Sequence, residues 1–187
     1  MNDIEENFVT FCINGELGLA QKFLLENPNI NISAQNEAAF RYTCHSGQLL
    51  VAQWLLEVKP CINISVDNEM AFRIACYKGH LLVAQWLLTI CPTINISTEN
   101  EYAFRWSCYY GQLLVAQWLQ TLKPYLYVIN YNDDGSYKDY YIRVKEEAKW
   151  QRRKYLVWLA SNESPCKSNI FYRIPQDVSR YIISNYL

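Results

Sequence analysis

The feature that most constrains this chain is a segment that returns at an interval of 32 residues. It covers residues 36–56, 68–88 and 100–119, and the first copy reads NEAAFRYTCHSGQLLVAQWLL. A fixed period of this length indicates a solenoid, in which each unit buries its apolar face only by stacking on its neighbours. The repeat therefore predicts a linear stack of similar units.

Each repeat carries the signals of two helices joined by a glycine turn. An asparagine is a good helix N-cap, and the glutamate after it suits the positive end of the helix dipole. That glutamate lies four residues before an arginine, which predicts an ion pair worth about 0.2–0.5 kcal/mol. A glycine then ends the first helix, and LLVAQWLL forms the second, with its tryptophan on the apolar surface. In the first full unit these residues are Asn36, Glu37, Arg41, Gly47 and Trp54, and all recur in the next two.

The chain before the first full repeat is a degenerate unit. Within residues 3–28, Phe8 and Cys12 lie 32 residues before their counterparts in the next unit. Glu5 and Glu6 are placed on its outside, as a solenoid needs at its first face. The Ile-Asn-Ile-Ser segments that open the later units are short and β-prone.

Cysteine usage favours packing over chemistry. Cys12, Cys44, Cys76 and Cys108 share the 32-residue period and an inward position, where a small apolar side chain is needed. There is no CxxC pair and only two histidines, so neither a metal site nor another cofactor is expected. Reduced thiols, no visible signal peptide and no membrane-spanning run predict a cytoplasmic protein with no membrane partner.

The last third of the chain departs from the repeat. Residues 126–161 predict a divergent unit with an extended hairpin, whose turn is signalled by Asp134 and Gly135. Residues 162–187 predict a linker followed by a C-terminal helix. The basic run at residues 149–154 suits a solvated helix better than a nucleic-acid site, because its charges spread over more than one face and glutamates lie nearby.

The repeated motif resembles the ankyrin repeat. Asp67-Asn68-Glu69-Met70-Ala71-Phe72-Arg73 stands where ankyrin repeats carry Asp-Gly-x-Thr-Pro-Leu-His, Cys76 stands at the second alanine, and Gly79-His80 matches Gly-His. The Thr-Pro-Leu-His network is replaced by Ala-Phe-Arg. This variant is similar to the ankyrin proteins of Mimivirus and related giant viruses.

The resemblance implies an all-α ankyrin solenoid of helix-turn-helix units with short β-hairpins and a C-terminal capping helix. Residues 1–29 would form the N-terminal capping unit, and residues 30–125 three repeats of 32 residues. Residues 126–161 would form the divergent unit, and residues 162–187 the linker and C-terminal helix.

The tail also resembles the opening of an F-box, or of the pox-type ankyrin C-terminal motif called PRANC. The residues that carry this are Ile174, Pro175, Val178 and Ile182. An F-box would imply a Skp1-type adaptor as partner. The alternative is a helix that covers the exposed end of the last unit.

Positions that differ between otherwise constant repeats are the candidate partner-binding residues. They correspond to the hairpin tips and inner helix through which ankyrin proteins bind, and four tyrosines among them suit an interface hot spot. The alternative is drift at exposed sites. The candidates are Gln35, His45, Ser46, Asp67, Met70, Tyr77, Lys78, Glu99, Tyr102, Tyr109 and Tyr110.

No constellation points to catalysis. Cys44 and His45 are adjacent, but neighbours on a helix point about 100° apart, so adjacency does not bring them together. No phosphate-binding glycine loop or acid/base carboxylate pair stands out. The sequence thus predicts a non-enzymatic protein-binding module, viral and directed at a host protein. The alternative is a substrate adaptor for an SCF-type ubiquitin ligase.

Overall fold

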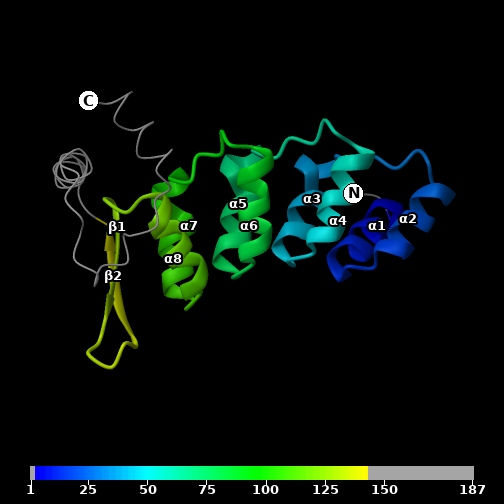
Figure 1. Cartoon of the computed structure of the whole chain (residues 1–187). Helices are drawn as coiled ribbons and strands as arrows, with labels where there is room; N and C mark the ends of the chain where they lie inside the picture. The colour runs from blue at the N-terminus through cyan, green and yellow to red at the C-terminus, as the bar shows by residue number, and fades with distance from the viewer. Residues whose placement is uncertain (1–2, 143–187) are drawn as a thin grey trace. The chain divides into compact units, whose positions relative to one another are not determined.

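The computed structural model describes residues 3–142, in which eight helices precede a two-stranded antiparallel sheet (Figure 1). The chain divides into two compact units, Met1–Leu122 and Lys123–Leu187. The elements are α1 (Asp3–Asn14), α2 (Leu17–Glu26), α3 (Ala34–His45), α4 (Leu49–Val58), α5 (Val66–Tyr77), α6 (Leu81–Ile90), α7 (Thr98–Tyr109), α8 (Leu113–Leu122), β1 (Tyr127–Tyr131) and β2 (Tyr137–Ile142). The tail residues Ile174, Pro175, Val178 and Ile182, the basic run and the predicted capping helix lie outside the described residues.

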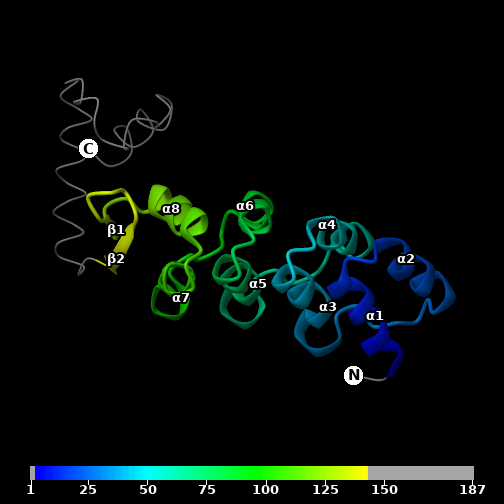
Figure 2. The ribbon, with the colours of Figure 1, turned by 90° about the horizontal axis from the view of Figure 1, so that it is seen from below.

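The helices of the first unit form two layers. The odd-numbered helices pack on one another in chain order, α1 on α3, α3 on α5 and α5 on α7. Each also packs against the even-numbered helix that follows it, and the even-numbered helices make the second layer (Figure 2). This is the stack of helical pairs that the 32-residue period predicts, so the predicted fold class is confirmed.

The core of this stack repeats with the sequence. The same inner-helix and outer-helix positions are almost fully buried in every unit, namely Phe8, Phe40, Phe72 and Phe104; Cys12, Cys44, Cys76 and Cys108; and Ala20, Ala52, Ala84 and Ala116. The predicted inward position of the periodic cysteines is therefore confirmed. Because every unit contributes the same side chains, the seam continues from one unit to the next.

The tryptophans of the second helices join adjacent units. Trp54 is half-buried, and its ring centroid lies 6.2 Å from that of Phe8 in the preceding unit. Trp86 contacts Phe40 at 6.2 Å in the same way, and Trp118 contacts Phe72 at 6.3 Å. Tilted aromatic pairs at this separation add to the burial of apolar surface. The tryptophans thus lie on the apolar surface, as predicted, but they fill the space between units.

The first helix of each unit ends at a left-handed glycine, as predicted. Gly47 has a φ of 75°, and its amide donates to the Cys44 carbonyl at 3.2 Å. A Cβ at Gly47 would lie 2.5 Å from Nδ1 of His80 in the next unit. Glycine is therefore required twice, for its backbone conformation and for the close approach of the neighbouring unit.

The start of the first helix differs from the prediction. Residues 35–37 all have positive φ, between 51° and 60°, so Asn36 lies inside a left-handed turn and is not an N-cap. The same turn occurs at residues 67–69 and 99–101, and right-handed helix begins only after each. The Ile-Asn-Ile-Ser segments before these turns, expected to be β-prone, contain turns and no strand.

The two strands lie in the second unit, where the extended hairpin was predicted. β1 pairs with β2 in antiparallel register, with Val128 opposite Tyr141 and Ile129 opposite Tyr140. Gly135 has a φ of 82°, and the carboxylate of Asp134 accepts hydrogen bonds from the Ser136 amide at 2.9 Å and hydroxyl at 2.6 Å. These bonds hold the pKa of Asp134 below its usual value.

Candidate functional site

The repeated arginine holds the left-handed turn in place. Arg41 donates from Nε to the Asn36 carbonyl at 2.6 Å and from Nη2 to the Gln35 carbonyl at 2.9 Å. Arg73 makes the equivalent bonds to Asn68 at 2.7 Å and Asp67 at 2.9 Å. A guanidinium suits this role because its donors form a fixed fork.

The predicted ion pair between Glu37 and Arg41 is therefore wrong. The Glu37 carboxylate is buried, where it accepts a hydrogen bond from the Ser33 hydroxyl at 2.5 Å and from the Asn63 amide at 3.4 Å. Because Asn63 belongs to the next unit, this glutamate connects two units. Glu69 contacts the Asn95 amide in the same way, at 3.4 Å.

Side chains on the turns also connect neighbouring units. Nη1 of Arg41 lies 2.8 Å from the Met70 sulfur and 3.4 Å from the Asp67 carboxylate, both in the next unit. Asn68 donates to the Glu99 carboxylate at 2.7 Å. Among the predicted binding residues, Asp67, Met70 and Glu99 therefore already have structural contacts.

Five aromatic side chains from α5, α7 and the residue after α7 form one group, here called the aromatic cluster: Tyr77, Tyr102, Trp106, Tyr109 and Tyr110. The first three are half-buried and the last two are exposed. The ring centroid of Tyr77, on α5, lies 6.1 Å from that of Tyr102 and 5.6 Å from that of Tyr110. These contacts connect α5 to α7 and its C-cap. Trp106 lies 5.5 Å from Tyr102, 5.3 Å from Tyr109 and 5.6 Å from Tyr110 between ring centroids. Despite these contacts, Tyr109 is 71% exposed and Tyr110 is 54% exposed.

Helical spacing creates this cluster. Tyr102, Trp106 and Tyr109 recur at intervals of four and three residues, which places them on one face of α7. Sequence reasoning identified the four tyrosines but missed Trp106. The signal was present, because Trp106 occupies a repeat position that holds Tyr42 and Ile74 in the preceding units.

Two cations flank the aromatic cluster. The guanidinium carbon of Arg73 lies 5.0 Å from the centroid of the Tyr102 ring, and Nζ of Lys78 lies 5.2 Å from that of Tyr77. Burial raises the pKa of Tyr102. The nearby hydroxyls of Tyr77 and Tyr110 raise this pKa further, whereas the positive charge of Arg73 lowers it. The Tyr102 hydroxyl therefore stays protonated at physiological pH, and the cluster has positive charge at its edge.

The remaining predicted residues lie elsewhere on the inner layer. His45 is half-buried at the end of α3, and its carbonyl oxygen lies 2.9 Å from Nε2 of His80. Burial lowers the pKa of His45, and the charges of Lys78 and His80 lower it further. Ser46 is half-buried beside it, while Gln35 is exposed on the first turn. The structure thus brings together the four tyrosines and Lys78.

Cys44, which stands next to His45 in the sequence, is fully buried. Burial raises the pKa of Cys44 well above its usual value, so this thiol is not an activated nucleophile. Within residues 3–142, no group of three His, Cys, Asp or Glu side chains could hold a metal ion, and no helix is long and apolar enough to cross a membrane.

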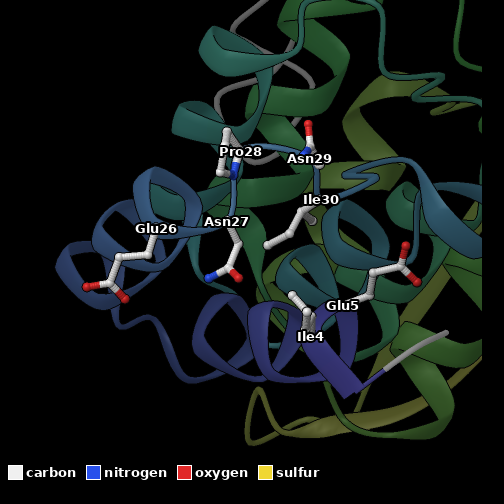
Figure 3. Close-up of a pocket in the computed structure, with 7 residues that line it drawn as sticks. All are labelled: Ile4, Glu5, Glu26, Asn27, Pro28, Asn29 and Ile30. Carbon is white, nitrogen blue, oxygen red and sulfur yellow. The ribbon is translucent and has the colours of Figure 1, made fainter.

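An open pocket of about 350 Å³ lies in the N-terminal unit (Figure 3). It is lined by Ile4, Glu5, Glu26, Asn27, Pro28, Asn29 and Ile30, from the start of α1, the last residue of α2 and the segment that follows α2. It contains carboxylates and amides but no nucleophilic side chain. The pocket shares no residue with the predicted site.

The comparisons with known proteins agree with the helical stack. No protein-family model and no curated protein match the sequence. The X-ray structure of an ankyrin repeat family protein from Legionella pneumophila is similar, with a TM-score of 0.52 and 30% sequence identity. The match covers 64% of this chain and 36% of the Legionella chain, so it spans about a third of that protein. The likeness shows that the fold is an ankyrin repeat solenoid.

Proposed function

We propose that this chain is a non-enzymatic module that binds a protein partner through the aromatic cluster. The observation that carries the proposal is the exposure of Tyr109 and Tyr110 in a cluster that also includes Tyr77, Tyr102 and Trp106. Tyrosine and tryptophan dominate the hot spots of protein interfaces, because they bury a large area with few rotatable bonds. The ankyrin repeat fold, typically an interaction scaffold, supports the same conclusion.

The contacts within the cluster support tight binding. Each ring is held by at least one other ring, from the same helix or from the adjacent one. A partner therefore meets side chains that are already ordered, which lowers the entropic cost of association. Arg73 and Lys78 at the edge favour a partner with acidic groups beside its apolar anchor.

Affinity capture followed by mass spectrometry tests the proposal. The full chain is the bait, and the double variant Tyr109→Ala/Tyr110→Ala is compared with wild type. Leu25→Ala is the matched control, since Leu25 is an exposed apolar residue on α2. We expect the double variant to lose at least about tenfold in capture of specific partners, equivalent to about 1.4 kcal/mol. Undiminished capture, with both variants folded, would refute the proposal.

We further propose that the partner is a host protein. The support is the resemblance of AFRxxC and LLVAQWLL to the ankyrin proteins of Mimivirus and related giant viruses. Bait added to a host-cell lysate is expected to retain a host protein in a manner that depends on Tyr109 and Tyr110. If the bait retains only viral proteins, from a lysate of infected cells, this proposal is contradicted.

The second candidate function is a substrate adaptor for an SCF-type ubiquitin ligase. Its support is the F-box-like sequence of Ile174, Pro175, Val178 and Ile182. In this case the full chain captures a Skp1-type adaptor, and deletion of residues 170–187 abolishes capture while Tyr109→Ala/Tyr110→Ala does not. A deletion that only lowers thermal stability would instead assign these residues to a cap.

A further inference from the structure

The outer helices of the three full repeats are almost free of charge. Helices α4, α6 and α8 have ten residues each, and Glu57 is the single charged residue among them. An exposed helix layer normally carries charged and polar residues on its solvent face. This absence needs an explanation that the aromatic cluster, on α5 and α7, does not provide.

The solvent side of these three helices carries apolar rows. Leu50, Leu82 and Leu114 occupy the same repeat position and are 70%, 69% and 72% exposed. Eight residues later in each helix comes a second exposed apolar residue, and the half-buried tryptophan lies between the two at helical spacing. The outer apolar face is defined by Leu50, Leu82 and Leu114 with Val58, Ile90 and Leu122.

The two apolar rows end at the N-terminal unit, where the exposed leucines of α2, Leu19 and Leu25, occupy other repeat positions. In the first unit the two equivalent positions hold Gly18 and Glu26, and Glu26 forms an exposed ion pair with Lys22 at 3.8 Å. The apolar rows therefore span three successive units and stop at the N-terminal one. Exposure of single hydrophobic residues is normal, but exposed apolar residues at the same two positions of three successive units favour an interface.

We propose that the outer apolar face binds the same face of a second copy of this chain, related by a two-fold axis. The low charge of these helices favours a second copy as the partner. A two-fold interface places each residue's patch against itself, so any net charge would repel its own copy. A layer with one charged residue in three helices avoids this penalty, and the central part of an interface is typically depleted of charge.

The spacing of the apolar rows also favours a second copy. The rows repeat once per unit, and a surface with the same interval between rows is available on another copy of the chain. A two-fold axis through the middle unit brings Leu82 against Leu82 of the copy. The same axis brings Leu50 against Leu114 of the copy and Leu114 against Leu50, so all three exposed leucines are covered at once.

Sedimentation velocity of the full chain between about 1 and 100 µM tests the proposal, because interfaces of modest area dissociate in this range. The wild type is expected to shift from monomer to dimer. The triple variant Leu50→Gln/Leu82→Gln/Leu114→Gln is expected to stay monomeric, with unchanged circular dichroism and Tm, since these side chains are exposed. Leu25→Gln, at an exposed leucine on α2, keeps the dimer. A monomeric wild type, or a triple variant that still dimerises, would overturn the inference.

Disulfide trapping tests the two-fold arrangement separately. Single cysteines are introduced in a background of Cys61→Ser, Cys91→Ser and Cys166→Ser, with oxidised glutathione as the oxidant. Leu82→Cys is expected to link to itself, while Leu50→Cys links to Leu114→Cys and not to itself. Self-linking of Leu50→Cys as fast as its linking to Leu114→Cys would refute the axis. Partner capture through Tyr109 and Tyr110 is a separate readout, so each proposal can fail alone.

Discussion

Arg41, Arg73 and Arg105 each donate to the left-handed turn of their own repeat. Three consecutive residues with positive φ are costly, because each L-residue in this region crowds its Cβ against the following carbonyl. The turn nevertheless occurs in three units, and in each the arginine five residues after the asparagine donates to the turn's carbonyls. The guanidinium is therefore a structural element of the fold.

Replacing Arg41 should destabilise the chain more than replacing Arg105. Arg41 is buried and donates to two turn carbonyls and Met70, whereas Arg105 makes one bond of 3.4 Å to Asn100. We expect Arg41→Ala to lower the free energy of unfolding by about 2 kcal/mol, from the loss of charge-assisted hydrogen bonds. Arg105→Ala should cost less than about 1 kcal/mol. Urea unfolding measures both.

The same experiment distinguishes charge from geometry. Arg41→Lys keeps the positive charge near Asp67 but removes the fork that reaches two carbonyls. It should therefore recover less than half of the stability lost in Arg41→Ala. Full recovery by lysine, or equal losses for Arg41→Ala and Arg105→Ala, would contradict the assignment of this arginine to the turn.

At the scale of elements, the glycine turn joins each unit to the next. Gly47 packs against His80, and Gly79 packs against Gln112, so the residue after one turn glycine lies over the glycine of the preceding unit. Gly111 has the same left-handed backbone, with a φ of 69°, but nothing within 4 Å of the position of a Cβ. The units thus provide both a packed and an unpacked copy of one turn.

This pair of glycines gives a matched prediction. Gly111→Ala pays only the cost of an alanine at positive φ, about 1–2 kcal/mol. Gly79→Ala, with a φ of 84°, also places a methyl group against the Gln112 side chain, and should lower the free energy of unfolding by about 1 kcal/mol more. Thermal or urea unfolding of the two variants provides the comparison. Equal losses would mean that Gln112 moves away without cost.

The elements also show what the sequence could and could not predict. The period, the glycine turns and the buried cysteines were predictable, because each rests on one repeated residue with one physical role. The left-handed turn was not, because Asn36 is a good N-cap and Glu37 is a good first-turn residue by local criteria. Only contacts between Arg41 and the carbonyls of the turn, and between Glu37 and the next unit, decide otherwise.

In the whole stack, the two layers differ in what they hold constant. LLVAQWL recurs unchanged on α4, α6 and α8, whereas the inner helices of the same units change Tyr42 to Ile74 to Trp106 at one position. The aromatic cluster therefore needs two particular units side by side, and its members could be predicted only as variable positions. The repeat period predicts that the residues of the outer apolar face recur in each unit. Only the structure shows that their side chains are exposed.

A repeat array held by contacts between neighbours should tolerate the loss of one complete unit. Deleting residues 65–96 removes one period and brings α3 against α7, where the Phe40 ring can meet Trp118 as it now meets Trp86. We expect the shortened chain to fold with the same helical signal per residue. Because the deletion removes one buried phenylalanine, the free energy of unfolding should fall by at least ~2 kcal/mol. The urea m-value should fall as well, because the shorter chain exposes less surface on unfolding.

The matched control is a deletion out of phase with the repeat. Removing residues 65–86 leaves a partial unit, so the inner and outer helices can no longer align and the apolar seam is broken. Circular dichroism and urea unfolding should then report a largely unfolded or aggregated chain. If the in-phase deletion unfolds as completely as the out-of-phase one, the units are not interchangeable, and the stack depends on contacts that the 32-residue period does not describe.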